Sequence, residues 1–191
     1  MSDASFFHTK VEVTQKIYSM YSLLINKIQS SVPHQNFKYP EQTDLSLGKI
    51  SKGENYRKLP YIVVDFPRYF KKPDMLVYRA MFWWGKYFIF TLHLSGSCAV
   101  KYKASFLENY VKLNLKNTYF CISKKQWEHA VSKRDFRRMD KLTREEIEAC
   151  INANGFIKIS RKLPLKDYKK FLATGSDTFE EFLSVFSDDV K

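Results

Sequence analysis

The sequence predicts an α+β protein, folded as a single domain around a mainly antiparallel sheet of about five strands covered by helices. The stretch 59–96 is rich in Val, Ile, Phe, Tyr and Trp, which favour strands. An apolar stripe at helical spacing precedes this stretch, and further helical patterns follow it. Because the helices flank the strands instead of alternating with them, we do not expect a doubly wound parallel sheet.

Composition divides the chain into four stretches. We expect a helix over 11–29, a strand-rich core over 59–96, a basic region of helices and strands over 101–163, and an acidic helical C-terminus over 165–191. In the first stretch the apolar residues recur along one helical face, and Pro33 ends the pattern. Residues 34–58 are polar and irregular, which indicates a connecting loop whose most notable side chains are Tyr56 and Arg57.

Within the core, Pro60 and Pro67 bracket a first strand, 61–66, because proline donates no ladder hydrogen bond. Two aromatic runs, 75–82 and 86–94, follow it and flank Trp84-Gly85, a pattern typical of a hairpin. A two-residue loop at Trp84-Gly85 would mix charges into the most apolar row of side chains.

A three-residue loop, Trp83-Trp84-Gly85, pairs Phe82 with Lys86 and separates the apolar side chains of the hairpin from the polar ones, so we prefer it. It also places Gly85 where such loops use a left-handed residue. The apolar face then holds Leu76, Tyr78, Ala80, Phe82, Phe88, Phe90, Leu92 and Leu94.

The opposite face collects four polar side chains. In this register Arg79, Thr91 and His93 share the less apolar face, and Asp65 joins them if the first strand lies beside the hairpin. One interpretation is structural: Asp65 and Arg79 form an ion pair, and a carbonyl satisfies His93. The other is a small enzyme or ligand site, in which Arg79 holds an anion and His93 handles a proton.

Positive charge is concentrated in the second half of the chain. The whole chain carries a net charge of +12. From Lys101 to Arg144 the chain contains twelve basic and four acidic residues, a local net charge of +8. The densest part contains Lys133, Arg134, Phe136, Arg137 and Arg138, and basic groups beside an aromatic ring suit phosphate contacts and stacking. This predicts a nucleic-acid or acidic-protein partner, with a solvated basic face as the alternative. The acidic tail, including Asp188 and Asp189, could fold over this region and neutralise it.

The basic region also contains local helix and strand signals. Thr143 and Glu146 have the spacing of a capping box, which predicts a helix from there to about Ala153, closed at Asn154-Gly155. The other elements that we expect are helices over 102–113, 123–131, 166–172 and 177–186, a short strand over 117–123, and a half-exposed strand over 156–163.

The chain contains no motif of a known catalytic or cofactor site, such as GxSxG, Walker A, GxGxxG or HExxH. Cys98, Cys121 and Cys150 stand far apart, which favours reduced thiols over disulfides or a zinc site, and we expect neither metal nor cofactor. Neither a signal peptide nor a membrane helix is evident, so we expect a soluble, cytoplasmic protein without membrane insertion. A non-enzymatic binding protein is the favoured class. Trp83 and Trp84 at the hairpin tip could form an oligomer contact.

One part of the core resembles a small group of uncharacterised bacterial proteins. The residues that carry the resemblance are Gly53-Glu54-Asn55-Tyr56, Leu59-Pro60-Tyr61, Asp65-Phe66-Pro67-Arg68 and Arg79-Ala80-Met81-Phe82-Trp83-Trp84-Gly85. The resemblance covers mainly residues 53–96. It implies a shared core and carries over no functional residue.

Overall fold

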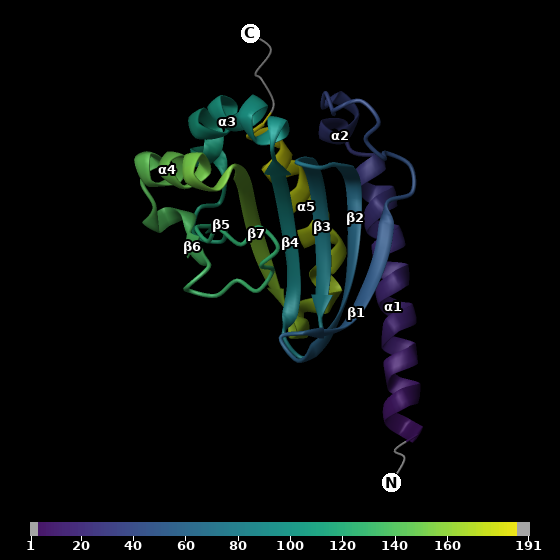
Figure 1. The fold of residues 1–191 in the computed structure, drawn as a ribbon. Helices are drawn as coiled ribbons and strands as arrows, with labels where there is room; N and C mark the ends of the chain where they lie inside the picture. Colours follow the sequence, from purple (N-terminus) through teal and green to yellow (C-terminus); the bar gives the residue numbers. More distant parts are fainter. Residues whose placement is uncertain (1–3, 187–191) are drawn as a thin grey trace.

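The computed structural model describes residues 4–186 and contains one seven-stranded antiparallel sheet. The strands lie in the order β1-β2-β3-β4-β7-β5-β6, and every neighbouring pair is antiparallel (Figure 1). Their bounds are β1 Lys49–Tyr56, β2 Leu59–Lys71, β3 Asp74–Trp83, β4 Tyr87–Ser95, β5 Tyr119–Cys121, β6 Phe136–Arg138 and β7 Phe156–Pro164.

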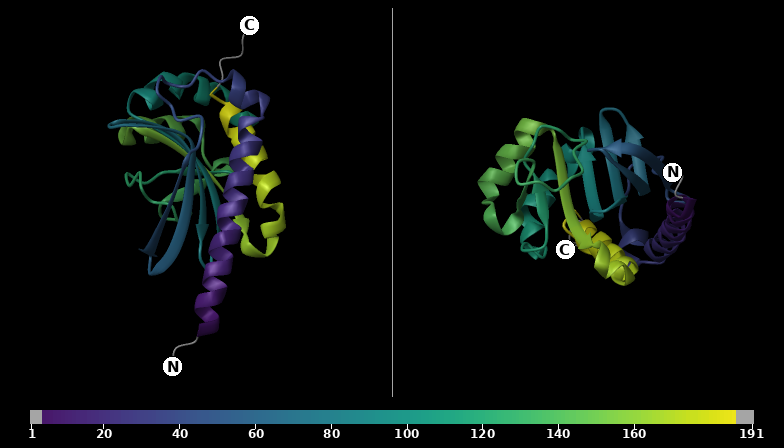
Figure 2. Two further views of the ribbon diagram at one scale, coloured as in Figure 1. Left: turned by 90° about the vertical axis from the view of Figure 1, so that its right-hand side faces the viewer. Right: turned by 90° about the horizontal axis from the view of Figure 1, so that it is seen from below.

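Helices cover one face of the sheet and one end of it. The long helix α1 and the C-terminal helix α5 lie on the same side of the sheet, as both views in Figure 2 show. Helices α3 and α4 pack against each other at one end of the sheet, where α3 contacts β3, β4 and β7 and α4 contacts β7. The α-helices are α1 Ala4–Gln29, α2 Val32–Asn36, α3 Ser97–Asn109, α4 Arg144–Asn154 and α5 Phe171–Ser184. Three 3-10 helices are η1 Tyr110–Lys112, η2 Met139–Lys141 and η3 Leu165–Lys170.

The main core lies between the sheet and helices α1 and α5. All eight side chains assigned to the apolar face of the hairpin belong to it, so the predicted sorting of the two faces is confirmed. The predicted pairing is wrong by two residues: Trp83 lies opposite Tyr87, and the loop is Trp84-Gly85-Lys86. The faces survive this shift because side chains alternate with a period of two. Gly85 has a φ of 65°, which allows the turn in which the Lys86 amide donates to the Trp83 carbonyl.

The sheet has two strands more than the expected five. The stretch interpreted as an irregular loop contains α2 and the edge strand β1, which joins β2 through Arg57 and Lys58. Both of these residues have positive φ, 50° and 67°, as a tight two-residue hairpin turn requires. The second additional strand, β6, lies inside the basic cluster. Strand β2 also continues past Pro67, with an irregularity in its pairing between Asp65 and Arg68.

The second face of the sheet is covered by the connection between β5 and β6. We refer to residues 122–135 as the covering segment. A helix was expected over 123–131, but this part has no regular structure, and its Ala130 packs against Val63, Met81, Trp83 and Ile89 of the sheet. Long irregular connections of this kind are uncommon in compact domains and are usually functional or mobile. Here the connection closes a second, smaller core.

The remaining elements follow the predictions in part. Helix α3 begins at Ser97, earlier than expected, and ends at Asn109. Strand β7 is almost fully buried instead of half-exposed, because the covering segment lies over its polar face. At the C-terminus, η3 leads directly into the single helix α5. Asp188 and Asp189, part of the tail that could fold over the basic region, lie outside the described residues.

The capping box of α4 is confirmed. The Glu146 amide donates to Thr143 Oγ1 at 3.2 Å, the Thr143 amide donates to Glu146 Oε2 at 3.0 Å, and Gly155 closes the helix with a φ of 71°.

We expect Thr143→Ala to lower the free energy of unfolding by about 1 kcal/mol, because it leaves a helix amide without its acceptor. Thr143→Ser keeps the acceptor and serves as the control in urea denaturation. Equal losses in both variants would show that the hydroxyl is not the stabilising group.

Candidate functional site

The four polar residues predicted to share a face do lie together, beneath the covering segment. Arg79 pairs across the strands with Asp65 on one side and Thr91 on the other. Asp65, Thr91 and His93 are buried, with 6%, 4% and 3% of their surface exposed. The register of β2, β3 and β4 therefore positions the cluster, as the alternation of side chains predicted.

Arg79 is the centre of this cluster. Its Nε and Nη2 donate to the two carboxylate oxygens of Asp65 at 2.6 and 2.8 Å, a bidentate geometry that favours a strong pair. Its Nη1 lies 3.2 Å from Nε2 of His129 in the covering segment. Because a guanidinium can only donate, Nε2 of His129 is the acceptor and this ring is neutral. Arg79 thus joins the sheet to the segment above it.

Lys158 of β7 makes the second such connection. It is completely buried, and its ammonium donates to the backbone carbonyls of Gln126 and Glu128 at 2.8 and 2.5 Å. Burial lowers the pKa of Lys158 to about 8, so the group is still charged at neutral pH. Next to it on the same face of the strand, Ser160 Oγ lies 2.8 Å from Thr91 Oγ1.

The two histidines of the cluster are held neutral. Burial, followed by the nearby charges of Lys158 and Arg79, holds the pKa of His93 and of His129 well below the ordinary value. Within the described part of the chain, His93 Nε2 is buried with no hydrogen-bond partner. The ring of His93 packs edge-on against Trp127 and Phe156. The expected carbonyl partner for this nitrogen is therefore not found.

The covering segment also forms hydrogen bonds and ion pairs with the turn between β1 and β2. The hydroxyl of Tyr56 donates to the Glu128 carboxylate and accepts from the amides of His129 and Ala130 at 2.9 and 2.7 Å. Arg57 pairs with Glu128 at 2.9 Å and with Asp135 at 3.4 Å. Burial acts to raise the pKa of Glu128, but hydrogen bonds from Tyr56 and Arg57 outweigh it and lower that pKa. These contacts keep the segment closed over the cluster.

Chemically, Asp65, Arg79 and Thr91 belong to a closed hydrogen-bond network, which leaves out His93 Nε2. Neither of the two cavities described below is lined by Asp65, Arg79, Thr91 or His93. Arg79 and Asp65 pair with each other, and the hydroxyls of Thr91 and Ser160 share a hydrogen bond. Nη1 of Arg79 and the ammonium of Lys158 bind the covering segment. The geometry favours a supporting role for these four residues.

The basic cluster is arranged differently from the prediction. Phe136, expected to stack on a base, is buried with 3% exposure beneath Lys158 and packs against Cys121 and Phe156. Arg138 forms a two-pronged pair with Asp140, at 2.8 and 2.7 Å. Stacking by Phe136 is therefore excluded, while the charges of this region remain available to a partner.

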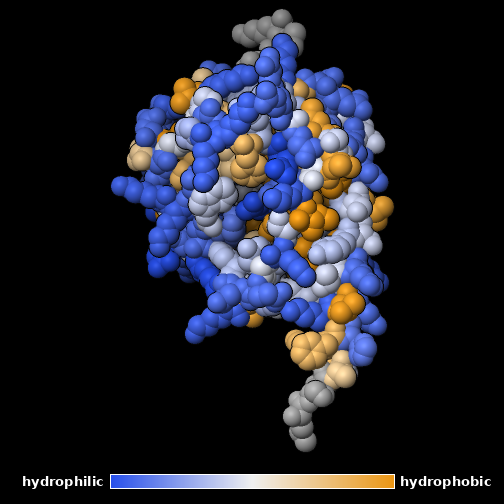
Figure 3. All heavy atoms as spheres, turned by 45° about the vertical axis from the view of Figure 1, so that its right-hand side comes forward, coloured by the Kyte–Doolittle hydropathy of each residue, from blue (hydrophilic) through white to orange (hydrophobic). Residues whose placement is uncertain are grey.

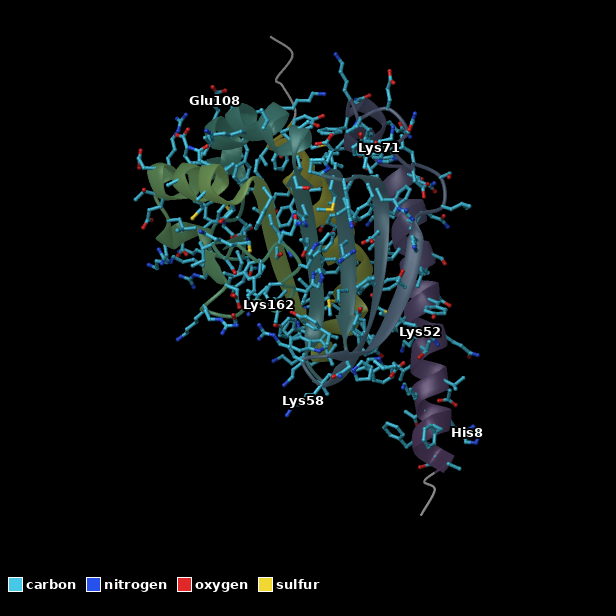
Figure 4. The ribbon with its side chains drawn as sticks, viewed as in Figure 1. His8, Lys52, Lys58, Lys71, Glu108 and Lys162 are labelled. Atoms are coloured by element: carbon cyan, nitrogen blue, oxygen red, sulfur yellow. The ribbon has the colours of Figure 1, made fainter. Side chains whose placement is uncertain are left out.

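These charges surround a groove of about 450 Å³ along β5, β6 and β7. Its cationic residues are Lys133, Arg137, Arg138 and Lys162, and none of its lining residues is acidic. Arg134 is exposed but does not line the groove. Lys162 is at the lower part of the sheet in Figure 4, with its ammonium 4.7 Å from the ring centre of Tyr119.

The hairpin tip does not offer the pair of exposed tryptophans that was expected. Trp83 is buried with 5% exposure between Tyr56 and Tyr87, and the partly buried Trp84 packs on Phe82. Exposed apolar rings occur instead on the first turns of α1, at Phe6 and Phe7, where Figure 3 shows apolar atoms on the projecting end of the helix.

Sequence reasoning missed the residues that complete these two sites. His129 and Lys158 join the buried cluster, and Tyr119 and Lys162 join the groove. For Lys158, Ser160 and Lys162 a signal existed, because they alternate with apolar residues in β7 and so share a face. No local signal indicated His129, since its position depends on how the covering segment folds back.

Within residues 4–186, no group of three or more His, Cys, Asp and Glu side chains is placed to hold a metal ion, and no helix there has the length and apolar character needed to cross a membrane. Comparison of the chain with protein-family models, with curated proteins and with solved structures finds no match.

Proposed function

We propose that the protein is a non-enzymatic binding protein that takes a nucleic-acid strand along the groove formed by β5, β6 and β7. The observation that carries the proposal is the lining of the groove, in which four of the eight residues are cationic and none is acidic. A groove of one charge sign raises the local concentration of an oppositely charged partner. Phosphate groups of a nucleic acid are such a partner.

The contacts of the groove suggest how binding would occur. Lys133 and Arg137 are exposed, and within residues 4–186 the ion pair of Arg137 is a long one, at 3.4 Å, with the half-exposed Glu146. An exposed pair of this kind contributes little and is readily exchanged for a phosphate. Because Phe136 is buried, the interaction rests on phosphates and is expected to be independent of base sequence.

Removing the exposed cations is expected to weaken binding and to reduce its dependence on salt. In Lys133→Gln/Arg137→Gln, the slope of log affinity against log salt concentration for a fluorescent single-stranded DNA should decrease in magnitude by about 1.4, about 0.7 for each lost phosphate contact. Fluorescence anisotropy over a salt series measures this slope.

The matched control is Lys166→Gln/Lys169→Gln, which removes two exposed lysines outside the groove. It should retain the wild-type slope. Absence of binding at low salt, where counterion release makes affinity greatest, would end the proposal. Equal losses in the two double variants would show that only the overall charge matters. Retention on heparin with no binding of DNA would indicate an acidic partner of another class.

A further inference from the structure

A second cavity, of about 960 Å³, lies at the other end of the sheet from Lys162. It is bordered by the turn between β2 and β3, the junction of β4 with α3, the start of the covering segment, and the turn between α4 and β7. Lys71, at the end of β2, is labelled near the top of Figure 4 and marks this end of the sheet. The cavity shares no lining residue with the basic groove.

Hydrogen bonds and one close backbone approach fix the rim of this cavity. Asp74 Oδ1 accepts from the Ser97 amide at 2.7 Å, and Ser95 Oγ donates to the Pro73 carbonyl at 2.8 Å. Between them, Gly96 has a φ of 59°, and a Cβ there would lie 2.3 Å from Asp74 Oδ1. Only glycine fits this close approach, which fixes the turn between β2 and β3 against α3. A cavity with a fixed rim binds a small molecule at low conformational cost.

Large aromatic rings remain exposed at this cavity. Phe70, at the end of β2, and Trp127, in the covering segment, both line it and are 40% and 49% exposed, although most aromatic side chains of the protein are buried. The Trp127 ring is supported by His93, whose ring centre is 5.9 Å away at an interplanar angle of 71°. Exposed flat rings of this kind provide stacking surfaces for a planar ligand.

Charged and amide groups accompany the two rings. Lys72 and Lys124 are exposed and line the cavity, and each supplies an ammonium group for an anion. Asp74 and Asn154 line it as well and supply acceptors, and Asn154 also supplies an amide donor. A carboxylate inside the cavity disfavours a polyanion, which would pass close to it. The combination suits a small molecule with a planar polar ring and a single anionic group.

We propose that this cavity binds a nucleoside monophosphate. Its base would stack on Trp127 and Phe70, its phosphate would meet Lys72 and Lys124, and Asp74 would accept a hydrogen bond from the base. This site is independent of the nucleic-acid groove, because the two share no residue.

Isothermal titration calorimetry of the full chain with AMP and with GMP tests the proposal. At least one of the two should bind, and adenosine or guanosine alone and inorganic phosphate alone should bind at least about tenfold more weakly, since each lacks one half of the contacts. Trp127→Ala and Lys124→Gln should each weaken binding about tenfold or more, because a stacked base and a paired phosphate each contribute that much.

Two further variants make the test decisive. Phe70→Ala probes the other exposed ring of the cavity if Trp127→Ala fails to fold, and Lys166→Gln is a control for overall charge. The proposal is overturned if neither nucleotide binds at millimolar concentration, or if Lys124→Gln and Phe70→Ala both retain wild-type affinity. It is equally overturned if Lys133→Gln/Arg137→Gln abolishes nucleotide binding, since the ligand would then occupy the groove.

Discussion

Arg79→Met is expected to lower the free energy of unfolding by about 3–5 kcal/mol, the loss typical of breaking a buried ion pair by removing one partner. The Arg79 and Asp65 side chains are 15% and 9% exposed, so little water can replace the guanidinium. The variant leaves the Asp65 carboxylate buried without its two donors and removes the donor that Arg79 supplies to His129. Urea denaturation at pH 7 measures the loss.

Two further variants test the cause of this loss. Asp65→Leu/Arg79→Met removes both charges and should recover much of the stability, because an apolar pair of similar size needs no compensation. Lys103→Met breaks an exposed pair with Glu148 and should change stability by no more than about 1 kcal/mol. A loss below about 1 kcal/mol in Arg79→Met would show that water reaches Asp65, and the supporting role of the cluster would be wrong.

The part of the fold that could be predicted from the sequence is the part governed by period and by local signals. The central hairpin was placed because its apolar residues alternate, and an error of two residues in the pairing left each side chain on its correct face. The capping box at Thr143 was recognisable because its two hydrogen bonds involve residues three positions apart. Each of these signals lies within a few residues of the structure that it specifies.

Strand β1 could not be predicted because its sequence, KISKGENY, contains few strand-favouring residues. Its turn has Arg57 and Lys58 at positive φ in place of the Asn-Gly or Asp-Gly that usually marks such a hairpin. Burial of Tyr56 against Trp83 and its hydrogen bonds to the covering segment supply the stabilisation instead. Strand β1 is thus stabilised by tertiary contacts, which leave no recognisable pattern in the local sequence.

The covering segment explains why the burial of Lys158 and of Phe136 was not predicted. The strand over 156–163 was predicted to be half-exposed, but its Lys158 is buried, because the carbonyls of Gln126 and Glu128 replace water around its ammonium. Phe136 was expected to be exposed beside basic residues, but the same segment draws it into the small core with Cys121. Both positions depend on contacts between residues distant in the sequence.

Acidification from pH 7 to pH 5 is expected to destabilise the protein through His93 and His129. Both are neutral in the folded state because burial and the charges of Lys158 and Arg79 lower their pKa. In the unfolded chain their pKa returns to about 6.5, so below that pH the unfolded state binds more protons than the folded state. The free energy of unfolding therefore falls as the pH falls, by up to about 1.4 kcal/mol per pH unit for each histidine.

Urea denaturation at intervals between pH 7 and pH 5 separates this effect from that of the carboxylates, whose ordinary pKa values lie below the range. His93→Leu and His129→Gln should each reduce the dependence by up to about 1.4 kcal/mol per pH unit. His34, whose pKa is also lowered by burial, contributes to the wild type and to both variants equally. His8→Gln, at an exposed position on α1, should keep the full wild-type dependence.

The pH dependence also shows where the protein opens first. A proton on His129 would place a third positive charge beside Arg79 and Lys158, with Asp65 as the nearby carboxylate. The repulsion acts on the segment that carries His129. The amides of His129 and Ala130, which donate to Tyr56, should therefore be less protected from hydrogen exchange at pH 5.5 than at pH 7, after correction for intrinsic exchange rates. Amides in the centre of β3 should change less. Equal acceleration of both sets would mean that acid unfolds the sheet as a whole, and a stability independent of pH would mean that the two rings are solvated and already titrate as in the unfolded chain.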